Sequence, residues 1–196
     1  MGTRNLTMVI HEGKTKVAQY GQWDGYPSGQ GATCLEFLRN ADLEKFKEKL
    51  RLVRFKTEDD GKELDDFLER IGCKDGWMDS NQSEKYNEKY PMLTRDNGAG
   101  ILKLIYENDK EVFLVDSSDF AMDSLFCEWA YVIDLDNEQL EVYSGFNQKE
   151  LDASERFYSS TPDGEYYGVG LVKKYSFKEL PTEGVFVSEC NPEDED

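Results

Sequence analysis

The sequence predicts an α+β protein in which an antiparallel sheet is built from N-terminal and C-terminal hairpins and covered by a helical middle segment. Residues 5–20 and residues 128–143 each hold two apolar runs separated by a short polar turn, which is the pattern of a β-hairpin. Between them, residues 32–71 repeat apolar side chains at helical spacing. Strands and helices do not alternate along the chain, which argues against a doubly wound parallel fold.

The first predicted element is a hairpin that pairs residues 5–11 with residues 15–20 across a turn at Glu12 and Gly13. A glycine-rich loop follows the hairpin. Residues 32–39 then repeat apolar side chains at helical spacing, which predicts the first helix.

Two further helices are predicted next. The second has Asn40 or Asp42 as its N-cap and places Leu43, Phe46 and Leu50 on one face. The third has the strongest local signal, because Thr57 and Asp60 have the spacing of a capping box and the apolar residues recur at i, i+3, i+4 and i+7. Those apolar residues are Leu64, Phe67, Leu68 and Ile71. The acidic residues of its first turn are favoured by the helix dipole and are interpreted as structural.

The rest of the chain predicts further short elements and an acidic tail. Residues 128–134 and residues 140–143 form the second hairpin. The other predicted elements are helices at 84–89 and 101–105, strands at 111–115 and 166–175, and a helical turn at 177–180. We expect residues 1–188 to form a single domain. Residues 189–196, which include five acidic residues, are expected to form a disordered tail.

The composition is typical of a cytoplasmic protein. No apolar run approaches the roughly 18–20 residues that span a bilayer, and the opening residues lack the apolar segment of a signal peptide. The four cysteines have no Cys-x-x-Cys spacing, so free thiols are expected rather than disulfides. His11 is the single histidine, which argues against a zinc site. We therefore expect cytoplasmic localisation, no membrane association, no metal and no cofactor.

The net charge of −18 restricts the partner. A field of this sign repels nucleic-acid phosphates and favours basic surfaces, so no direct nucleic-acid binding is expected. Two interpretations of the charge stay open: it keeps the protein soluble, or it imitates nucleic acid and occupies a basic groove of a partner protein. The basic residues between 45 and 56 are interleaved with Glu44 and Glu48, which is typical of a solvated helix face.

The loop between the first hairpin and the first helix is the candidate binding surface. Loops held on a rigid scaffold often carry function. Aromatic side chains in such a loop can anchor an interface, and its amides and carboxylate can supply directional hydrogen bonds. In the alternative interpretation, Trp23 closes the end of the sheet and Asp24 caps the turn through its own backbone. The candidate residues are Gln19, Gln22, Trp23, Asp24, Tyr26 and Gln30.

Three other patterns have a chemical and a structural interpretation. Residues 28–31 precede a helix as an anion-binding loop does, but they lack Gly-Lys-Ser/Thr, which favours tight packing at the start of the helix. Cys34 lies near a helix N-terminus, where thiols become reactive, yet its apolar surroundings favour a buried packing role. Asp134, Asp136 and Glu138 resemble a calcium loop without its glycine and terminal glutamate, which favours a hairpin turn.

Two sets of residues carry a likeness to a known family. The first set is Gly2-Thr-Arg-Asn-Leu-Thr7 with residues 17–31, and the second is residues 127–136 with residues 140–143. Together they resemble a family of small uncharacterised proteins from bacteria, their phages and some fungi, over nearly the whole chain. The resemblance implies no particular biochemical activity. Its association with phages implies a role in host interaction or anti-defence.

The sequence therefore predicts a non-catalytic binding protein, encoded by a phage or mobile element, that acts on a host protein with a basic surface. An anti-defence factor and a nucleic-acid mimic are both forms of this prediction. The alternative is a small-molecule-binding or amide-hydrolysing enzyme, because the layout of an N-terminal hairpin followed by helices resembles that of N-terminal-nucleophile hydrolases. Such enzymes begin with Ser, Thr or Cys. Removal of Met1 exposes Gly2, and only further processing exposes Thr3.

Overall fold

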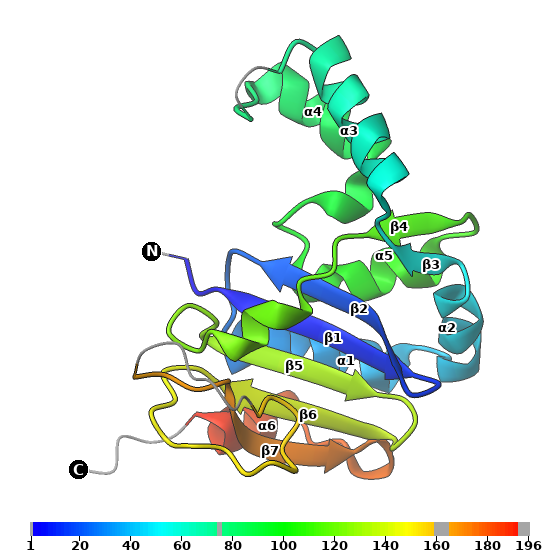
Figure 1. The fold of residues 1–196 in the computed structure, drawn as a ribbon. Coiled ribbons are helices and arrows are strands. Elements are labelled where there is room, and N and C mark those ends of the chain that lie inside the picture. Colours follow the sequence, from blue (N-terminus) through cyan, green and yellow to red (C-terminus); the bar gives the residue numbers. More distant parts are fainter. Residues whose placement is uncertain (1, 74–75, 159–164, 192–196) are drawn as a thin grey trace.

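A five-stranded sheet forms the centre of the protein (Figure 1). The computed structural model describes residues 2–73, 76–158 and 165–191. Along the sheet the strands follow the order β2-β1-β5-β6-β7. Their bounds are β1 (Asn5–His11), β2 (Lys14–Gly21), β5 (Trp129–Asp134), β6 (Gln139–Ser144) and β7 (Gly170–Ser176). The predicted α+β fold, with a sheet made of strands from both ends of the chain, is confirmed.

The two hairpins join through a parallel pair. The pairs β1–β2, β5–β6 and β6–β7 are antiparallel, as predicted, whereas β1 runs parallel to β5 with Asn5 opposite Trp129. A parallel pair requires a long connection, and the helical middle of the chain provides it. Alternating side chains of β1 enter opposite faces of the sheet: Leu6 and Met8 pack on one face and Val9 on the other. The sheet is therefore buried on both sides.

The two faces of the sheet are covered differently. Four helices pack on one face, and their side chains Phe46, Leu102 and Phe186 are fully buried there. These helices are α1 (Ala32–Asn40), α2 (Leu43–Leu50), α5 (Ile101–Glu107) and α6 (Glu183–Cys190). The other face is covered by the 3₁₀ helix η4 (Ser118–Met122) and by irregular chain that contributes Leu151 and Phe157. Helix α6 was not predicted, because its apolar residues follow no helical period.

The predicted N-caps locate the helices correctly. Asp42 is the N-cap of α2, since its carboxylate accepts hydrogen bonds from the amides of Glu44 and Lys45. The capping box of α3 (Glu58–Arg70) is present in full, with Thr57 and Asp60 each bonding to the backbone of the other.

Helix α3 does not cover the sheet. Together with α4 (Ser80–Lys89) it projects away from the body (Figure 1). Below them, β3 (Val53–Phe55) and β4 (Val112–Leu114) form a separate parallel pair. The predicted strand at 111–115 is thus confirmed, whereas its partner β3 was not predicted.

The remaining elements are short helical turns. They are η1 (Pro27–Gly31), η2 (Pro91–Leu93), η3 (Gly98–Gly100) and η5 (Phe177–Glu179), the last of which confirms the predicted turn before Pro181. The tail was expected to start at residue 189, but Glu189 and Cys190 end α6 and Cys190 is buried. This corrects the start of the expected tail, and residues 192–196 lie outside the described residues.

Candidate interface at one end of the sheet

The topology brings five chain segments to one end of the sheet. Because β1, β5 and β7 run in one direction and β2 and β6 in the other, the starts of β1, β5 and β7 lie beside the ends of β2 and β6. This end is formed by the residues before Asn5, Trp129 and Gly170 and after Gly21 and Ser144. The candidate loop after β2 is therefore one of five neighbouring segments.

Large apolar side chains are exposed on three of these segments. Two follow β2, two precede β5 and one follows β6. Their exposed fractions range from 39% to 57%. We call these side chains the rim. The rim consists of Trp23, Tyr26, Leu125, Phe126 and Phe146.

Hydrogen bonds and one cation–π contact connect the segments that carry the rim. The amide of Phe146 donates to the carbonyl of Ser124 over 2.7 Å. The guanidinium carbon of Arg4 lies 4.7 Å from the centroid of the Phe126 ring, and the amide of Arg4 donates to the carboxylate of Glu128 over 3.1 Å. These contacts therefore hold together the chain segments that carry the rim.

Two of the predicted site residues point inward. Gln19 is buried, and its Nε2 donates to the carbonyls of Tyr20 at 2.8 Å and Thr94 at 3.3 Å. Gln30 accepts a hydrogen bond of 2.7 Å from the amide of Ala99 through its Oε1. Both side chains therefore fasten the loop to the chain between residues 94 and 99.

Gln22 and Trp23 have mixed surroundings. The Oε1 of Gln22 accepts a hydrogen bond of 2.7 Å from the hydroxyl of Tyr20. The indole Nε1 of Trp23 donates to Asp96 over 3.1 Å, and a Cβ added at Gly2 would lie 2.5 Å from the indole ring. Trp23 therefore rests one face on the N-terminal strand segment and leaves about half of its surface in solvent.

Asp24 and Tyr26 face solvent most fully. Asp24 has a φ of 54°, in the left-handed region, and its carbonyl accepts a hydrogen bond of 2.9 Å from the amide of Gln30. Its carboxylate makes no hydrogen bond with any residue that the structure describes. Asp24 therefore closes the turn through its own backbone carbonyl, as the structural interpretation of this residue expects. The structure places Trp23, Asp24 and Tyr26 at the surface and turns Gln19 and Gln30 inward.

The glycine-rich segment packs tightly at the start of α1. A Cβ at Gly31 would lie 2.8 Å from the ring of Tyr131 and 2.9 Å from that of Phe186, so only glycine fits there. The amides of Gly29 and Gly31 both donate to the carbonyl of Tyr26. These amides are not free to hold an anion, and the packing interpretation is confirmed.

Cys34 is fully buried under this segment. Burial raises the pKa of the Cys34 thiol to about 12. A thiol with this pKa is protonated at neutral pH and is a poor nucleophile. The predicted packing role of Cys34 is therefore confirmed.

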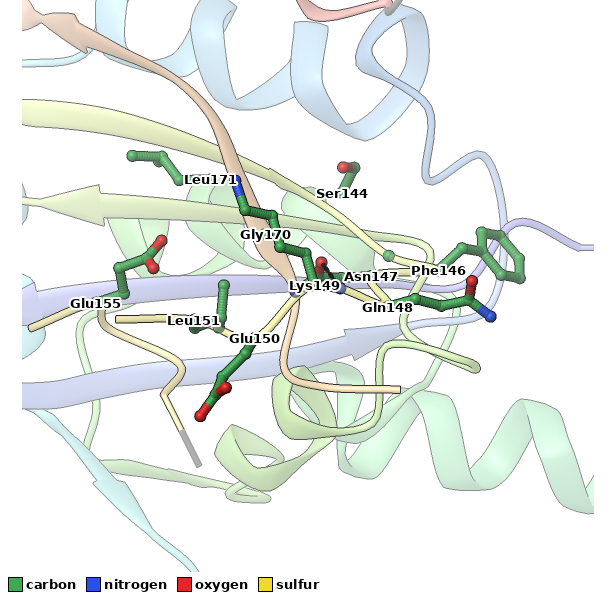
Figure 2. Close-up of a pocket in the computed structure, with 11 residues that line it drawn as sticks. Ser144, Phe146, Asn147, Gln148, Lys149, Glu150, Leu151, Glu155, Gly170 and Leu171 are labelled. Atoms are coloured by element: carbon green, nitrogen blue, oxygen red, sulfur yellow. Dashed lines mark hydrogen bonds between the residues drawn. The ribbon is translucent and has the colours of Figure 1, made fainter. Parts of the chain in front are cut away.

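A groove extends from the rim along the ends of β6 and β7 (Figure 2). Its volume is about 790 Å³. Figure 2 shows Phe146 and Gln148 at one end of the groove and Glu155 at the other. Lys149 and Glu150 add opposite charges to its wall. The rim is thus continuous with a concave, mixed-charge surface.

A buried ionic network anchors the chain segment that forms this groove. Glu141 accepts hydrogen bonds from Arg156 at 2.7 Å, Lys174 at 2.8 Å and the Tyr143 hydroxyl at 2.6 Å. Arg156 also donates to Asp134 over 2.7 Å. The carboxylates of Glu141 and Asp134 are each about 2% exposed. Arg156 therefore joins the irregular segment to two strands at once.

The network keeps both carboxylates ionised. Burial by itself raises the pKa of Glu141, but hydrogen bonds from Arg156, Lys174 and Tyr143 outweigh it and hold the pKa below its ordinary value. Burial acts in the same way on Asp134, and bonds from Asn137 and Arg156 lower its pKa overall. Carboxylates that are paired so fully serve to position the chain.

The turn residues after β5 also have a structural role. Asp134 accepts hydrogen bonds from the amides of Asp136 and Asn137 at 3.2 and 3.0 Å. This geometry confirms the hairpin-turn interpretation of these acidic residues. Among the described residues, no group of three or more His, Cys, Asp or Glu side chains is arranged to hold a metal ion.

Sequence reasoning missed the part of the rim that lies outside the first loop. Leu125, Phe126 and Phe146 lie in irregular segments, where no periodicity marks a side chain as exposed or buried. The available signal was their position directly before and after the second predicted hairpin.

No helix of the described chain is long and apolar enough to cross a membrane. No protein-family model, curated protein or solved structure matches the chain.

Proposed function

We propose that this chain is a non-catalytic interaction protein that binds a partner protein through the rim. The observation that carries the proposal is the gathering of five exposed, large apolar side chains on adjoining segments at one end of a rigid sheet. Contiguous exposed apolar surface marks interaction sites. Aromatic side chains usually supply most of the binding energy at such sites.

The charge supports a basic partner surface. The chain has a net charge of −18, and the carboxylate of Asp24 lies exposed between Trp23 and Tyr26 in the sequence of the rim loop. Opposite charges around an apolar centre speed association and reject partners of like charge. The partner proposed here is a host protein with a basic surface. The anti-defence role rests on the phage association of the bacterial, phage and fungal family that the sequence resembles. In the more specific form of this proposal, the acidic surface imitates nucleic acid and occupies a basic groove of the partner.

The groove beside Phe146 suggests how the partner is held. Its volume of about 790 Å³ is sufficient for several side chains, and Lys149 and Glu150 offer ion pairs at its wall. A loop of the partner would occupy the groove while the rim packs on the surface around it.

The hydrolase alternative stays a prediction. Thr3, the nucleophile that this alternative needs, is buried, and its carbonyl accepts a hydrogen bond of 3.0 Å from the amide of Gly25. No contact among the residues that the structure describes favours the reaction. Intact-mass spectrometry tests it, because a mature chain that starts at Thr3 would support the enzyme and one that starts at Met1 or Gly2 would remove its nucleophile.

Affinity capture from a native-host lysate tests the rim. We compare the wild type with Trp23→Ala, Phe146→Ala and the control Lys14→Ala, an exposed residue at the opposite end of the sheet. We expect both rim variants to lose the partner and the control to retain it, with all variants folded by circular dichroism. Capture that is equal in all four proteins would overturn the proposal.

Salt and nucleic acid separate mimicry from an ordinary interface. If the acidic surface imitates nucleic acid, partner binding falls steeply as salt rises, and DNA or RNA competes for the partner. Binding that is insensitive to salt, or simultaneous with nucleic acid, contradicts mimicry and leaves the rim interface intact.

A further inference from the structure

The projecting helical hairpin is folded with little support from the body. We call it the arm; its described residues are 58–73 and 76–89, in α3, α4 and their connection (Figure 1). Only Asp60 and Leu64 of α3 are buried, and no residue of α4 is. Both helices nevertheless begin with a complete capping box. The sequence thus specifies the arm locally although it contributes little to the core.

Contacts along the seam between the two helices orient the arm. The ring of Phe67 meets that of Tyr90, the residue that follows α4, edge to face, with centroids 5.4 Å apart. The hydroxyl of Tyr90 donates to Glu63 over 3.0 Å, and Nε2 of Gln82 donates to the carbonyl of Ile71 over 3.3 Å. At the base, Arg54 forms a two-pronged pair with Asp60. The apolar face of α3 is therefore turned toward α4, and its opposite face is turned to solvent.

The outward face of α3 is an acidic stripe. The helix holds seven acidic and two basic residues. At 100° per residue, five of the acidic side chains and Lys62 fall opposite the apolar seam, and all six are exposed. Asp59 pairs with Lys62 at 2.9 Å, whereas Asp65, Asp66 and Glu69 form no ion pair with the described residues. The stripe consists of Glu58, Asp59, Asp65, Asp66 and Glu69.

A tryptophan lies at the tip of the arm. Trp77 is 84% exposed, more than any other large apolar side chain that the structure describes, and Met78 beside it is also exposed. The Trp77 indole donates no hydrogen bond to the described residues. A tryptophan left in water forgoes the stabilisation that burial of its large apolar surface provides. This residue type is also strongly enriched among the anchors of protein interfaces.

We propose that the arm is a second docking element, which inserts Trp77 into an apolar pocket of a basic protein while the acidic stripe of α3 lies on a surface rich in lysine and arginine. Charge complementarity selects this occupant. Nucleic acid and anionic membranes are repelled by the stripe, and a second copy of this chain carries the same charge of −18. The proposal is independent of the rim, because the arm leaves the body beside β3 and β4.

Zero-length carbodiimide crosslinking tests the arm. The full chain is incubated with native-host lysate, and carboxylates in contact with partner lysines are coupled and mapped by mass spectrometry. We expect crosslinks from Asp65, Asp66 and Glu69 to lysines of one captured protein. We also expect about tenfold weaker capture by Trp77→Ala and by the triple variant D65N/D66N/E69Q.

A matched control separates the stripe from total charge. The triple variant E36Q/E48Q/E107Q removes the same three charges from exposed positions of α1, α2 and α5, and we expect it to change capture less than twofold. An equal loss with both triple variants would overturn the proposal, as would unchanged capture by the arm variants or no captured protein. Sedimentation that shows a dimer dissolved by Trp77→Ala would also overturn it.

The rim variants Trp23→Ala and Phe146→Ala are run in the same assay. Loss of capture with the rim variants alone leaves the rim proposal standing and rejects the arm. Loss of capture with the arm variants alone supports the arm proposal and rejects the rim proposal. Circular dichroism checks that each variant keeps its helices, which we expect because Asp65, Asp66, Glu69 and Trp77 are all exposed.

Discussion

The two ends of the five-stranded sheet are built in different ways. At the end opposite the rim, the turn after β1 and the turn after β5 are bound together by polar groups. The carboxylate of Asp136 accepts hydrogen bonds from the amides of Glu12 at 2.9 Å and Gly13 at 2.8 Å. The carboxylate of Asp134 satisfies the amides of its own turn. None of the described residues in the turns 11–14 and 135–138 is an exposed large apolar residue.

The rim end also joins its segments by backbone hydrogen bonds, yet it exposes aromatic rings. Backbone bonds such as that from Phe146 to Ser124 join its segments beneath the rings. The polar end shows that closing this sheet requires no exposed ring. The comparison therefore supports a partner that covers the exposed faces of the rim side chains.

The largest expected effect concerns the network that anchors the groove. Arg156→Ala leaves the carboxylates of Asp134 and Glu141 buried without their shared partner, so we expect the free energy of unfolding to fall by about 3 kcal/mol. Urea denaturation measures it, with exposed Arg39→Ala as the control. A loss below about 1 kcal/mol would show that the segment carrying Phe146 is held by other contacts.

The same network gives a signed dependence on pH. The folded protein lowers the pKa of Asp134 and Glu141, so their stabilising effect is present above about pH 4.5 and is lost as pH falls through the lowered values. In Arg156→Ala both carboxylates lose a hydrogen-bond donor that lowers their pKa, so we expect each to take up its proton at a higher pH than in the wild type. We therefore expect the stability difference between wild type and Arg156→Ala to narrow below about pH 4. A constant difference from pH 7 to pH 3 would contradict this.

The next effect concerns binding at the rim. We expect Trp23→Ala to weaken partner binding about 30-fold, or about 2 kcal/mol, and to lower the free energy of unfolding by about 1 kcal/mol. The stability loss follows from the hydrogen bond to Asp96 and the contact with Gly2. Asp24→Asn, which suits the positive φ of this position, should reduce binding with little change in stability. If Trp23→Ala unfolds the protein and Asp24→Asn leaves partner binding unchanged, the loop has a structural role and does not bind the partner.

A smaller effect separates inward from outward residues of the same loop. Gln30→Ala removes the acceptor of the Ala99 amide, so we expect the free energy of unfolding to fall by about 1–2 kcal/mol. We expect partner binding by the folded variant to change less than Tyr26→Ala changes it. If Gln30→Ala weakens binding more than Tyr26→Ala does, the division of the loop into inward structural residues and outward binding residues is wrong.

The smallest effect lies at the polar end. Asp136→Ala deletes the exposed acceptor of the Glu12 and Gly13 amides, which water can replace, so we expect a stability loss of about 0.5–1 kcal/mol. Thermal unfolding measures the loss, and affinity capture should be unchanged. If Asp136→Ala no longer captures the partner, the partner also contacts the polar end, and the two ends of the sheet do not differ in binding.

The elements that the sequence predicted are those with a local signal. Thr57 and Asp60 locate the start of α3 because a capping box is a contact between near neighbours in sequence. The hairpin of β5 and β6 follows from apolar runs around a polar turn. By contrast, β3 is only three residues long and α6 lacks an apolar period, so neither stood out from the surrounding loops.

The rim required information that no local pattern holds. Arg4 and Phe126 are distant in sequence and meet only because β1 pairs in parallel with β5. Arg156 likewise reaches Glu141 and Asp134 from an irregular segment. Long-range pairing decided which loops share an end of the sheet, and it could not be read from periodicity. The sequence therefore identified one segment of the rim and missed its neighbours.

Hydrogen–deuterium exchange of the chain, free and bound to the captured partner, tests whether the rim is the interface. We expect slower exchange of the amides at 22–26, 124–128 and 145–147 in the complex, with unchanged exchange at 11–14 and 135–138. Protection of the polar end, with unchanged exchange at the rim, would contradict binding through the rim.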